Sequence, residues 1–191
     1  MPKVIENIRE IILQTAKDKL LSDGYDRLSL RWVTGQCQIA VGTVYNYFPS
    51  KLALVTAIML EDWTAQKEKM QKACDAAENA EEGLQSIFTN LRDFSMRYQD
   101  VWHVAMHTKK VKEERVDGRS RRQMLIEQLA DTIRALLERL EMPCDAFLPR
   151  FMATTLLTYI TEPDFDYGQL DKVFTRILHG ENEICTQGRN V

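Results

Sequence analysis

The residues best suited to chemistry in this chain lie in one short stretch, residues 39–51. Thr43 offers a hydroxyl, and Tyr45 and Tyr47 each offer a phenol. Lys51 adds an ammonium group at the predicted start of a long helix, where first-turn amides also point outward. All of these groups can bind phosphate oxygens, so the stretch is a candidate for contact with a nucleic-acid backbone.

A helix over about residues 41–47 would carry these groups into the major groove of duplex DNA, where base edges present distinct donors and acceptors. Such close approach needs a small residue at the helix N-terminus, and Gly42 supplies it. Asn46 can read adenine through two hydrogen bonds, or it can point away from the DNA. Val44 and Phe48 are expected to face the protein core.

Three helices within about 45 residues are predicted to hold this stretch. Apolar residues at helical spacing predict the first helix over residues 4–22, and Gly24 ends it because glycine adopts the left-handed conformation at little cost. Ser29 can cap a short second helix, and Ser50 can cap a long fourth one. Two short helices joined by a tight turn form a helix-turn-helix module.

The motif Gly42-Thr43-Val44-Tyr45, followed by Tyr47-Phe48 and Ser50-Lys51, resembles the N-terminal signature of TetR-family transcriptional regulators. The Gly24-Tyr25 turn and the Leu28-Ser29-Leu30 helix entry match that family too. The resemblance implies a DNA-binding domain, a homodimer, and a C-terminal domain whose middle helices surround a ligand cavity.

The resemblance covers about residues 5–58 and adds roles to several of them. It implies that Ser29 holds a phosphate, that Arg31 can reach a base, and that Val41 faces a base with apolar contact alone. Arg31 and Val41 could instead be ordinary surface residues, and Tyr47 could serve packing. The candidate contacts with a double-stranded DNA operator are Ser29, Arg31, Val41, Gly42, Thr43, Tyr45, Asn46, Tyr47 and Lys51.

Two positions before the third helix depart from the family pattern. The turn holds Cys37-Gln38 where the family usually has a small residue and then glycine, so Gln38 must adopt the backbone geometry of that glycine. Ala40 stands where a serine or similar cap is common. Alanine cannot accept a hydrogen bond from a first-turn amide, at a cost of about 1 kcal/mol.

The rest of the chain is predicted to be wholly helical, without strand patterns or internal repeats. We expect an all-α fold of about nine helices. A helix-turn-helix DNA-binding domain over residues 1–50 is joined by a long helix to a ligand-binding and dimerisation domain over residues 51–180. A flexible tail over residues 181–191 follows.

Aromatic and methionine side chains in the middle of the chain suit an adaptable apolar site for a small apolar or aromatic effector. The same helical stripes could equally form ordinary core. The candidate pocket residues are Trp63, Phe88, Phe94, Met96, Tyr98, Trp102, Met106 and Met124.

The last two predicted helices, over about residues 145–161 and 168–179, are rich in large apolar side chains, as an obligate interface would be. Some of these residues must instead be intramolecular core. The resemblance implies that the two helices form a four-helix bundle with a second subunit. The candidate interface residues are Phe147, Phe151, Thr155, Tyr159, Leu170, Phe174 and Ile177.

The charge distribution matters more than the net charge of −3. Residues 1–51 hold seven basic and five acidic groups, a balance of +2, and the remainder holds 18 basic and 23 acidic groups, a balance of −5. This asymmetry permits DNA contact at the N-terminal end and argues against DNA wrapping around the whole surface.

Several other classes of protein are disfavoured. The four cysteines are far apart, so free thiols in a reducing cytoplasm are expected rather than zinc. No apolar run is long enough to span a membrane, and no secretory signal is present. His103 and His107 have metal-compatible spacing, but no acidic or cysteine ligand accompanies them, so a solvent-facing pair is favoured and no metal or cofactor is predicted.

Two functions remain open, and neither is enzymatic, because no catalytic set or phosphate-binding loop is visible. The first is a repressor released from DNA by a small, largely apolar ligand. The second is a DNA-binding nucleoid protein or protein-partner adaptor on the same fold, without a small-molecule inducer.

Overall fold

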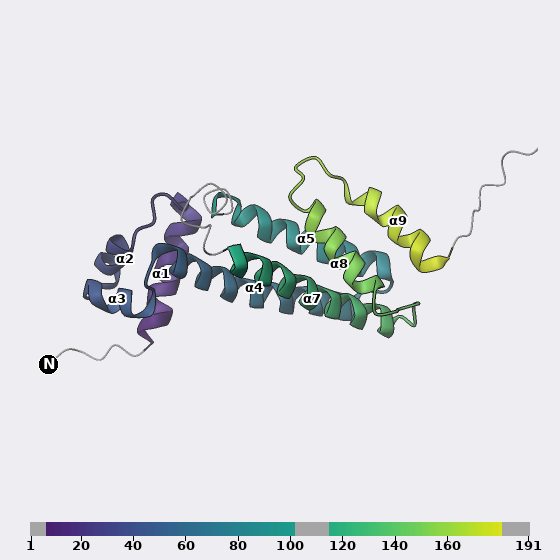
Figure 1. Ribbon diagram of the computed structural model, residues 1–191, viewed down its shortest axis with the longest axis horizontal. Coiled ribbons are helices and arrows are strands. Elements are labelled where there is room, and N and C mark those ends of the chain that lie inside the picture. Colours follow the sequence, from purple (N-terminus) through teal and green to yellow (C-terminus); the bar gives the residue numbers. More distant parts are fainter. Residues whose placement is uncertain (1–6, 102–114, 181–191) are drawn as a thin grey trace, which may run out of the picture. The chain divides into compact units, whose positions relative to one another are not determined.

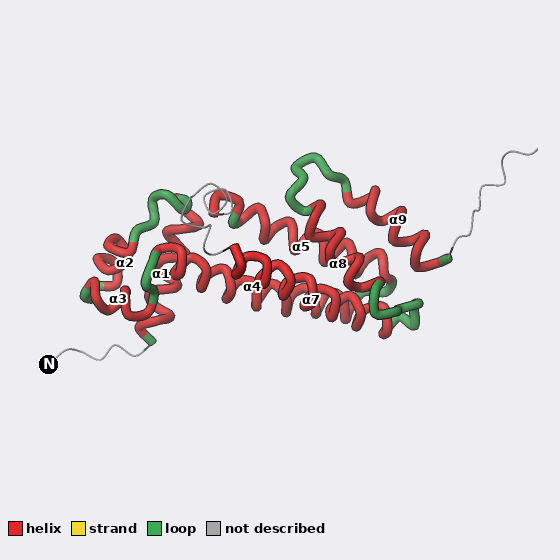
Figure 2. Tube along the Cα trace, viewed as in Figure 1, coloured by secondary structure: helices red, strands yellow, loops and turns green. Residues whose placement is uncertain are grey.

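The computed structural model describes residues 7–101 and 115–180, with side chains from residue 122 in the second range. Every regular element in these ranges is an α-helix (Figure 2), which confirms the predicted all-α fold. A predicted short helix near residues 101–106 lies largely outside the described residues. The described helices are α1 (Ile8–Asp23), α2 (Leu30–Cys37), α3 (Val41–Tyr47), α4 (Lys51–Ala76), α5 (Ala80–Arg97), α7 (Arg115–Arg139), α8 (Leu148–Tyr159) and α9 (Tyr167–His179), labelled in Figure 1.

The chain divides into two compact units. One contains residues 1–68 and 94–112, and therefore α1 to α3, most of α4 and the last turn of α5. The other contains residues 69–93 and 113–191, and therefore the end of α4, most of α5, and α7 to α9. No helix in the described ranges is both long and apolar enough to cross a membrane.

The ends of the N-terminal helices are set by the predicted local signals. Gly24 follows α1 with φ of 83°, and its amide donates to the carbonyl oxygen of Leu20. The Ser29 hydroxyl accepts a hydrogen bond from the Trp32 amide at 3.1 Å and caps α2. The Ser50 hydroxyl accepts one from the Ala53 amide at 3.0 Å at the start of α4. These caps satisfy amides that have no partner within their helices.

A buried carboxylate joins three helices of the first unit. The Asp62 side chain in α4 is only 8% exposed and forms an ion pair with Lys17 of α1. It also accepts a hydrogen bond of 2.5 Å from the Tyr98 hydroxyl and lies 3.6 Å from the Arg97 guanidinium, at the end of α5. Donors from both neighbouring elements thus offset the cost of removing this carboxylate from water.

Tyr98 is suited to its part in this cluster. Its side chain is fully buried, and burial, followed by the hydrogen bond to Asp62, raises the pKa of Tyr98 far above its usual range. The phenol is therefore protonated at neutral pH and donates its proton to the carboxylate. We name Lys17, Asp62, Arg97 and Tyr98 the Asp62 cluster.

The second unit is held by apolar packing and by side chains that bond to exposed helix ends. α7 and α8 pack against each other. The Arg139 guanidinium donates to the carbonyl oxygens of Cys74 and Ala77, at 2.8 and 2.6 Å, and so satisfies the end of α4. A Cβ atom on Gly83 would lie 2.5 Å from the end of the Leu136 side chain, so a larger residue at this point of α5 would require that side chain of α7 to move.

The Asp62 cluster predicts a large difference between two neighbouring acidic residues. Asp62→Ala should lower the free energy of unfolding by about 2–3 kcal/mol, because the buried Tyr98 hydroxyl and the Lys17 ammonium lose their shared acceptor. Glu61→Ala breaks only the exposed ion pair with Arg9 and should cost less than about 1 kcal/mol. Urea denaturation followed by circular dichroism measures both values, and equal losses would contradict the assigned role of the cluster.

Candidate nucleic-acid interface

The turn before α3 has the geometry expected from its sequence. Gln38 has φ of 53° and ψ of 42°, which is the left-handed conformation that glycine adopts more easily. The Ile39 amide donates to the carbonyl oxygen of Thr34 at 3.2 Å and closes the turn. Ala40 precedes α3 without a side-chain hydrogen bond to the helix, as predicted. The start of α3 is therefore locally less stable than that of α2.

Only one narrow side of α3 faces the protein. Val44 is fully buried, and Phe48 is buried directly after the helix. Val41, Tyr45 and Tyr47 are each 45–48% exposed, which is a large apolar exposure for a helix of seven residues. Gly42 and Asn46 are exposed as well, and Thr43 is half-buried. We name Val41, Gly42, Tyr45 and Asn46, which lie at helical spacing on the exposed side, the α3 face.

Gly42 has no packing role among the described residues. Its φ is not positive, and a Cβ atom built on it would meet nothing within 4 Å. Alanine would be favoured in this helix by roughly 1 kcal/mol. The missing side chain leaves open space on the exposed side of α3, as Gly35 does on α2.

Lys51 begins α4 but is held by nearby groups. Its ammonium nitrogen lies 4.0 Å from the centroid of the Tyr25 ring and 3.4 Å from the carbonyl oxygen of Asp26. Burial lowers the pKa of Lys51, and the charge of Asp26 opposes that shift. The ammonium group is thus positioned at the N-terminus of α4, where the helix dipole adds to its positive potential.

The remaining predicted DNA contacts lie at the start of α2. Ser29 is exposed, and its oxygen already accepts the Trp32 amide, so its hydroxyl proton is the group that can be donated to a phosphate. Arg31 is exposed in the first turn of the same helix.

The predicted effector residues separate into different surroundings. Trp63, Phe94 and Tyr98 form one buried aromatic group, with ring centroids 5.5 Å apart for the first pair and 5.1 Å for the second. Phe88 is buried in the other unit, 5.2 Å from the Tyr167 ring. The Met96 side chain is 57% exposed, which is more than expected for a residue that lines a ligand pocket. Met124 is exposed too, and Trp102 and Met106 lie outside the described residues, as do His103 and His107.

The predicted interface residues divide into exposed and buried sets. Leu170 and Phe174 are buried within the chain, because they point inward from α9, so a second subunit could not reach them. Thr155 is half-buried, and its hydroxyl donates to the carbonyl oxygen of Phe151. The exposed residues are Phe147, Phe151, Tyr159 and Ile177. Val173, which was not among the predicted residues, is also exposed on α9.

Asp62 is a structural residue that the sequence interpretation missed. It lies four residues after buried Ile58 and four before buried Gln66, on the inward stripe of α4. A carboxylate at a position where the helical pattern calls for an inward-facing apolar residue indicates a buried polar cluster. Within the described residues, no group of three or more His, Cys, Asp or Glu side chains could hold a metal ion.

Comparison with known proteins finds a family match for the segment around α3. A family model described as "Bacterial regulatory proteins, tetR family" matches residues 12–58, which contain α2, α3 and the cap of α4. Residues 12–58 therefore match the TetR family. The predicted resemblance is thereby confirmed over the segment that forms the α3 face.

Relatives of this TetR-family domain are regulators. The HTH-type transcriptional regulator UidR of Escherichia coli K12 is 37% identical over 54 residues, and the UidR protein of Shigella flexneri matches equally. The matched segment covers 28% of this chain and 28% of the curated relative. These names agree with the prediction of a regulator rather than an enzyme.

Solved structures share the fold along most of the chain. A transcriptional regulator from Cytophaga hutchinsonii aligns with a TM-score of 0.62, covering 88% of this chain and 93% of that one at 19% identity. The fatty acid degradation regulator FadR from Bacillus halodurans aligns with a TM-score of 0.56, covering 95% and 99% at 16% identity. At these identities the likeness shows a common fold alone.

The strained turn of the TetR-family domain gives a stability prediction. Gln38→Gly should raise the free energy of unfolding by about 0.5–1 kcal/mol, because relief of left-handed strain, about 1–2 kcal/mol, exceeds the added freedom of the unfolded chain, about 0.4–1 kcal/mol. Gln36→Gly, two residues earlier inside α2, should instead lower it by about 1 kcal/mol. Thermal or urea denaturation measures both, and a loss of stability in Gln38→Gly would show that the turn is unstrained.

Proposed function

We propose that this protein is a transcriptional regulator that binds duplex DNA with the α3 face. The observation that carries the proposal is Gly42, whose missing side chain leaves open space on an exposed helix that matches the TetR family. Tyr45 and Asn46 lie exposed beside that space. A helix of this kind fits the major groove, where the glycine allows close approach and its neighbours supply hydrogen bonds.

The groups around α3 suit a phosphate clamp. Tyr45 and Tyr47 are exposed phenols on the helix itself. Ser29 stands at the start of α2, and Lys51 stands at the start of α4. Each of these four residues can meet a backbone phosphate, which fixes the orientation of the domain without reading sequence. Sequence choice then rests on Thr43, on Arg31 in the first turn of α2, and on apolar contact by Val41.

We propose that the regulator acts as a homodimer through the outward apolar sides of α8 and α9. Phe151 and Tyr159 on α8, and Val173 and Ile177 on α9, are exposed at helical spacing. Phe147, just before α8, is 69% exposed and stacks on Phe151 with a centroid distance of 6.0 Å. A second copy would cover these side chains, and two-fold symmetry would provide a second reading helix for the next DNA half-site.

The regulatory part of the proposal is repression relieved by a small, largely apolar ligand. Such a ligand must bind one arrangement of the protein more tightly than the other, and the DNA-competent arrangement must be the one it disfavours. The buried aromatic group of Trp63, Phe94 and Tyr98 includes a partner of Asp62, which in turn contacts α1 of the DNA-binding domain. Such a regulator would work in the cytoplasm, where bacterial DNA lies.

Gly42→Ala tests DNA binding without harming the fold. We expect DNA affinity to fall about tenfold or more, because the new methyl group occupies space needed by DNA, while helix stability rises slightly. Duplexes selected from a random library by the natural protein supply the ligand, and fluorescence anisotropy measures the affinity. Gly35→Ala is the matched control, since this exposed glycine of α2 also has nothing within 4 Å of a Cβ atom. Equal affinities for the two variants would refute the assigned contact.

Ile177→Glu tests the proposed dimer. The new carboxylate would be buried against a second copy, so we expect the protein to become monomeric and to lose affinity for two-half-site duplexes. Gln169→Glu places the same charge at an exposed polar position of α9 and should stay dimeric. Sedimentation or light scattering gives the mass of each variant. A dimeric Ile177→Glu variant would place the interface on another surface.

A further inference from the structure

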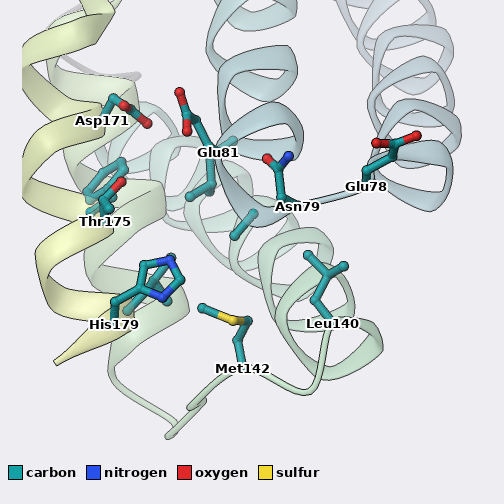
Figure 3. Close-up of a pocket in the computed structure, with 12 residues that line it drawn as sticks. Glu78, Asn79, Glu81, Leu140, Met142, Asp171, Thr175 and His179 are labelled. Carbon is teal, nitrogen blue, oxygen red and sulfur yellow. The ribbon is translucent and has the colours of Figure 1, made fainter.

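The second unit contains a pocket of about 210 Å³ that none of the predicted effector residues lines. It is formed by residues 78–81 and Leu84 around the start of α5, by Leu140 and Met142 after α7, and by one side of α9 (Figure 3). All of these residues belong to the same compact unit, so the pocket does not depend on how the two units are arranged.

The floor of the pocket is apolar. Leu84, Phe174 and Leu178 are buried beneath it, and Leu140 and Met142 are half-buried at its edge. Apolar walls of this kind bind the hydrocarbon part of a ligand, and methionine adapts to its shape.

The rim of the pocket is acidic. Glu78, Glu81 and Asp171 contribute three carboxylates, and His179 lies at the other end of α9. Figure 3 shows Glu81 and Asp171 at one end of the pocket, with Met142 and Leu140 at the opposite end. The described residues that line the pocket include no Lys or Arg. A ligand with a positive group at one end and an apolar body at the other matches this layout.

Two features that could favour an anion are already occupied. The N-terminus of α5 would attract negative charge, but Asn79 accepts a hydrogen bond from the Glu82 amide at 2.9 Å, and Glu82 accepts one from the Glu78 amide at 2.9 Å. The Arg139 guanidinium is engaged by carbonyl oxygens at the end of α4. The negative rim is therefore not neutralised by these neighbours.

Tyr167 is buried near two of the rim carboxylates, Asp171 and Glu81. Its hydroxyl has no hydrogen-bond partner and is shielded from water. Burial, followed by the charges of Asp171 and Glu81, raises the pKa of Tyr167 well above its usual range. Asp171 and Glu81 therefore both act on the hydroxyl of Tyr167, which does not itself line the pocket.

We propose that this pocket binds a small organic cation, with its ammonium group between Glu81 and Asp171 and its apolar body on the Leu84–Phe174–Leu178 floor. A cavity of about 150 Å³ holds benzene, so this pocket suits a ligand of roughly eight to ten non-hydrogen atoms. An aryl-alkyl ammonium ion has that size and polarity.

The site is independent of the DNA-binding and dimer proposals. Asp171 and Thr175 line the pocket, whereas Val173 and Ile177 are exposed on roughly the opposite side of α9. A second copy seated on the outward side would leave the pocket open. Direct binding to the full-length protein therefore tests the site even if the protein did not recognise DNA.

The experiment uses isothermal titration calorimetry with three probes that share one apolar body. We expect 2-phenylethylammonium to bind at least about tenfold more tightly than 2-phenylethanol, and phenylacetate to show no binding, because only the ammonium group complements the rim. Equal binding of the ammonium ion and the alcohol, tighter binding of phenylacetate, or no binding of the ammonium ion would each overturn the proposal.

Variants locate the site. Glu81→Gln combined with Asp171→Asn keeps the shape but removes both charges, so the preference for the ammonium ion over the alcohol should disappear. Asp93→Asn removes an exposed carboxylate of α5 outside the pocket and should leave it intact. Thr175→Phe fills the pocket and should abolish binding of both probes. Circular dichroism verifies that each variant is folded. If a folded double variant still preferred the ammonium ion over the alcohol as strongly as the unmodified protein does, the cation would bind elsewhere.

Discussion

The buried carboxylate of Asp62 is the constraint on which the first unit depends. Helix α3 has seven residues and buries only Val44, so it cannot hold its own position. It packs on α2, and α2 packs on α1. Helix α1 is in turn tied to α4 and to the end of α5 through Asp62 and its partners. A carboxylate buried this deeply is stable only while its donors stay in place, so a shift of any one helix would be felt by the others.

The segment from Gln38 to Gly42 contains three features that are unfavourable for local stability. It contains a left-handed non-glycine residue, an uncapped helix start and a helical glycine without a packing role. Sequences usually agree with their local structure, and departures gather where function requires them. The neighbouring α2 and α4 are capped conventionally by Ser29 and Ser50. Apart from Gly35 of α2, the local departures of this region therefore lie in and directly before α3.

Helix α9 illustrates how one short element serves three environments. Leu170, Phe174 and Leu178 form the core, Val173 and Ile177 are exposed, and Asp171 and Thr175 line the acidic pocket. The sequence shows an apolar-rich amphipathic helix, and helical periodicity alone does not separate an inward stripe from a stripe that awaits a second subunit. Leu170, Phe174 and Ile177 were therefore grouped together as interface candidates, although the first two pack within the chain.

The sequence by itself determined the features that depend on near neighbours in the chain. These include the helix caps at Ser29 and Ser50, the glycine stop at Gly24, the left-handed Gln38 and the bounds of α3. Tertiary structure alone decided what depends on distant residues, namely the Asp62 cluster, the position of Lys51 over Tyr25, and the pocket that joins α5, α7 and α9. The preference of residues for caps, turns and helices depends on a few neighbours, so it can be recognised in one segment of the sequence. Burial and charge pairing arise only when segments far apart in the chain come into contact.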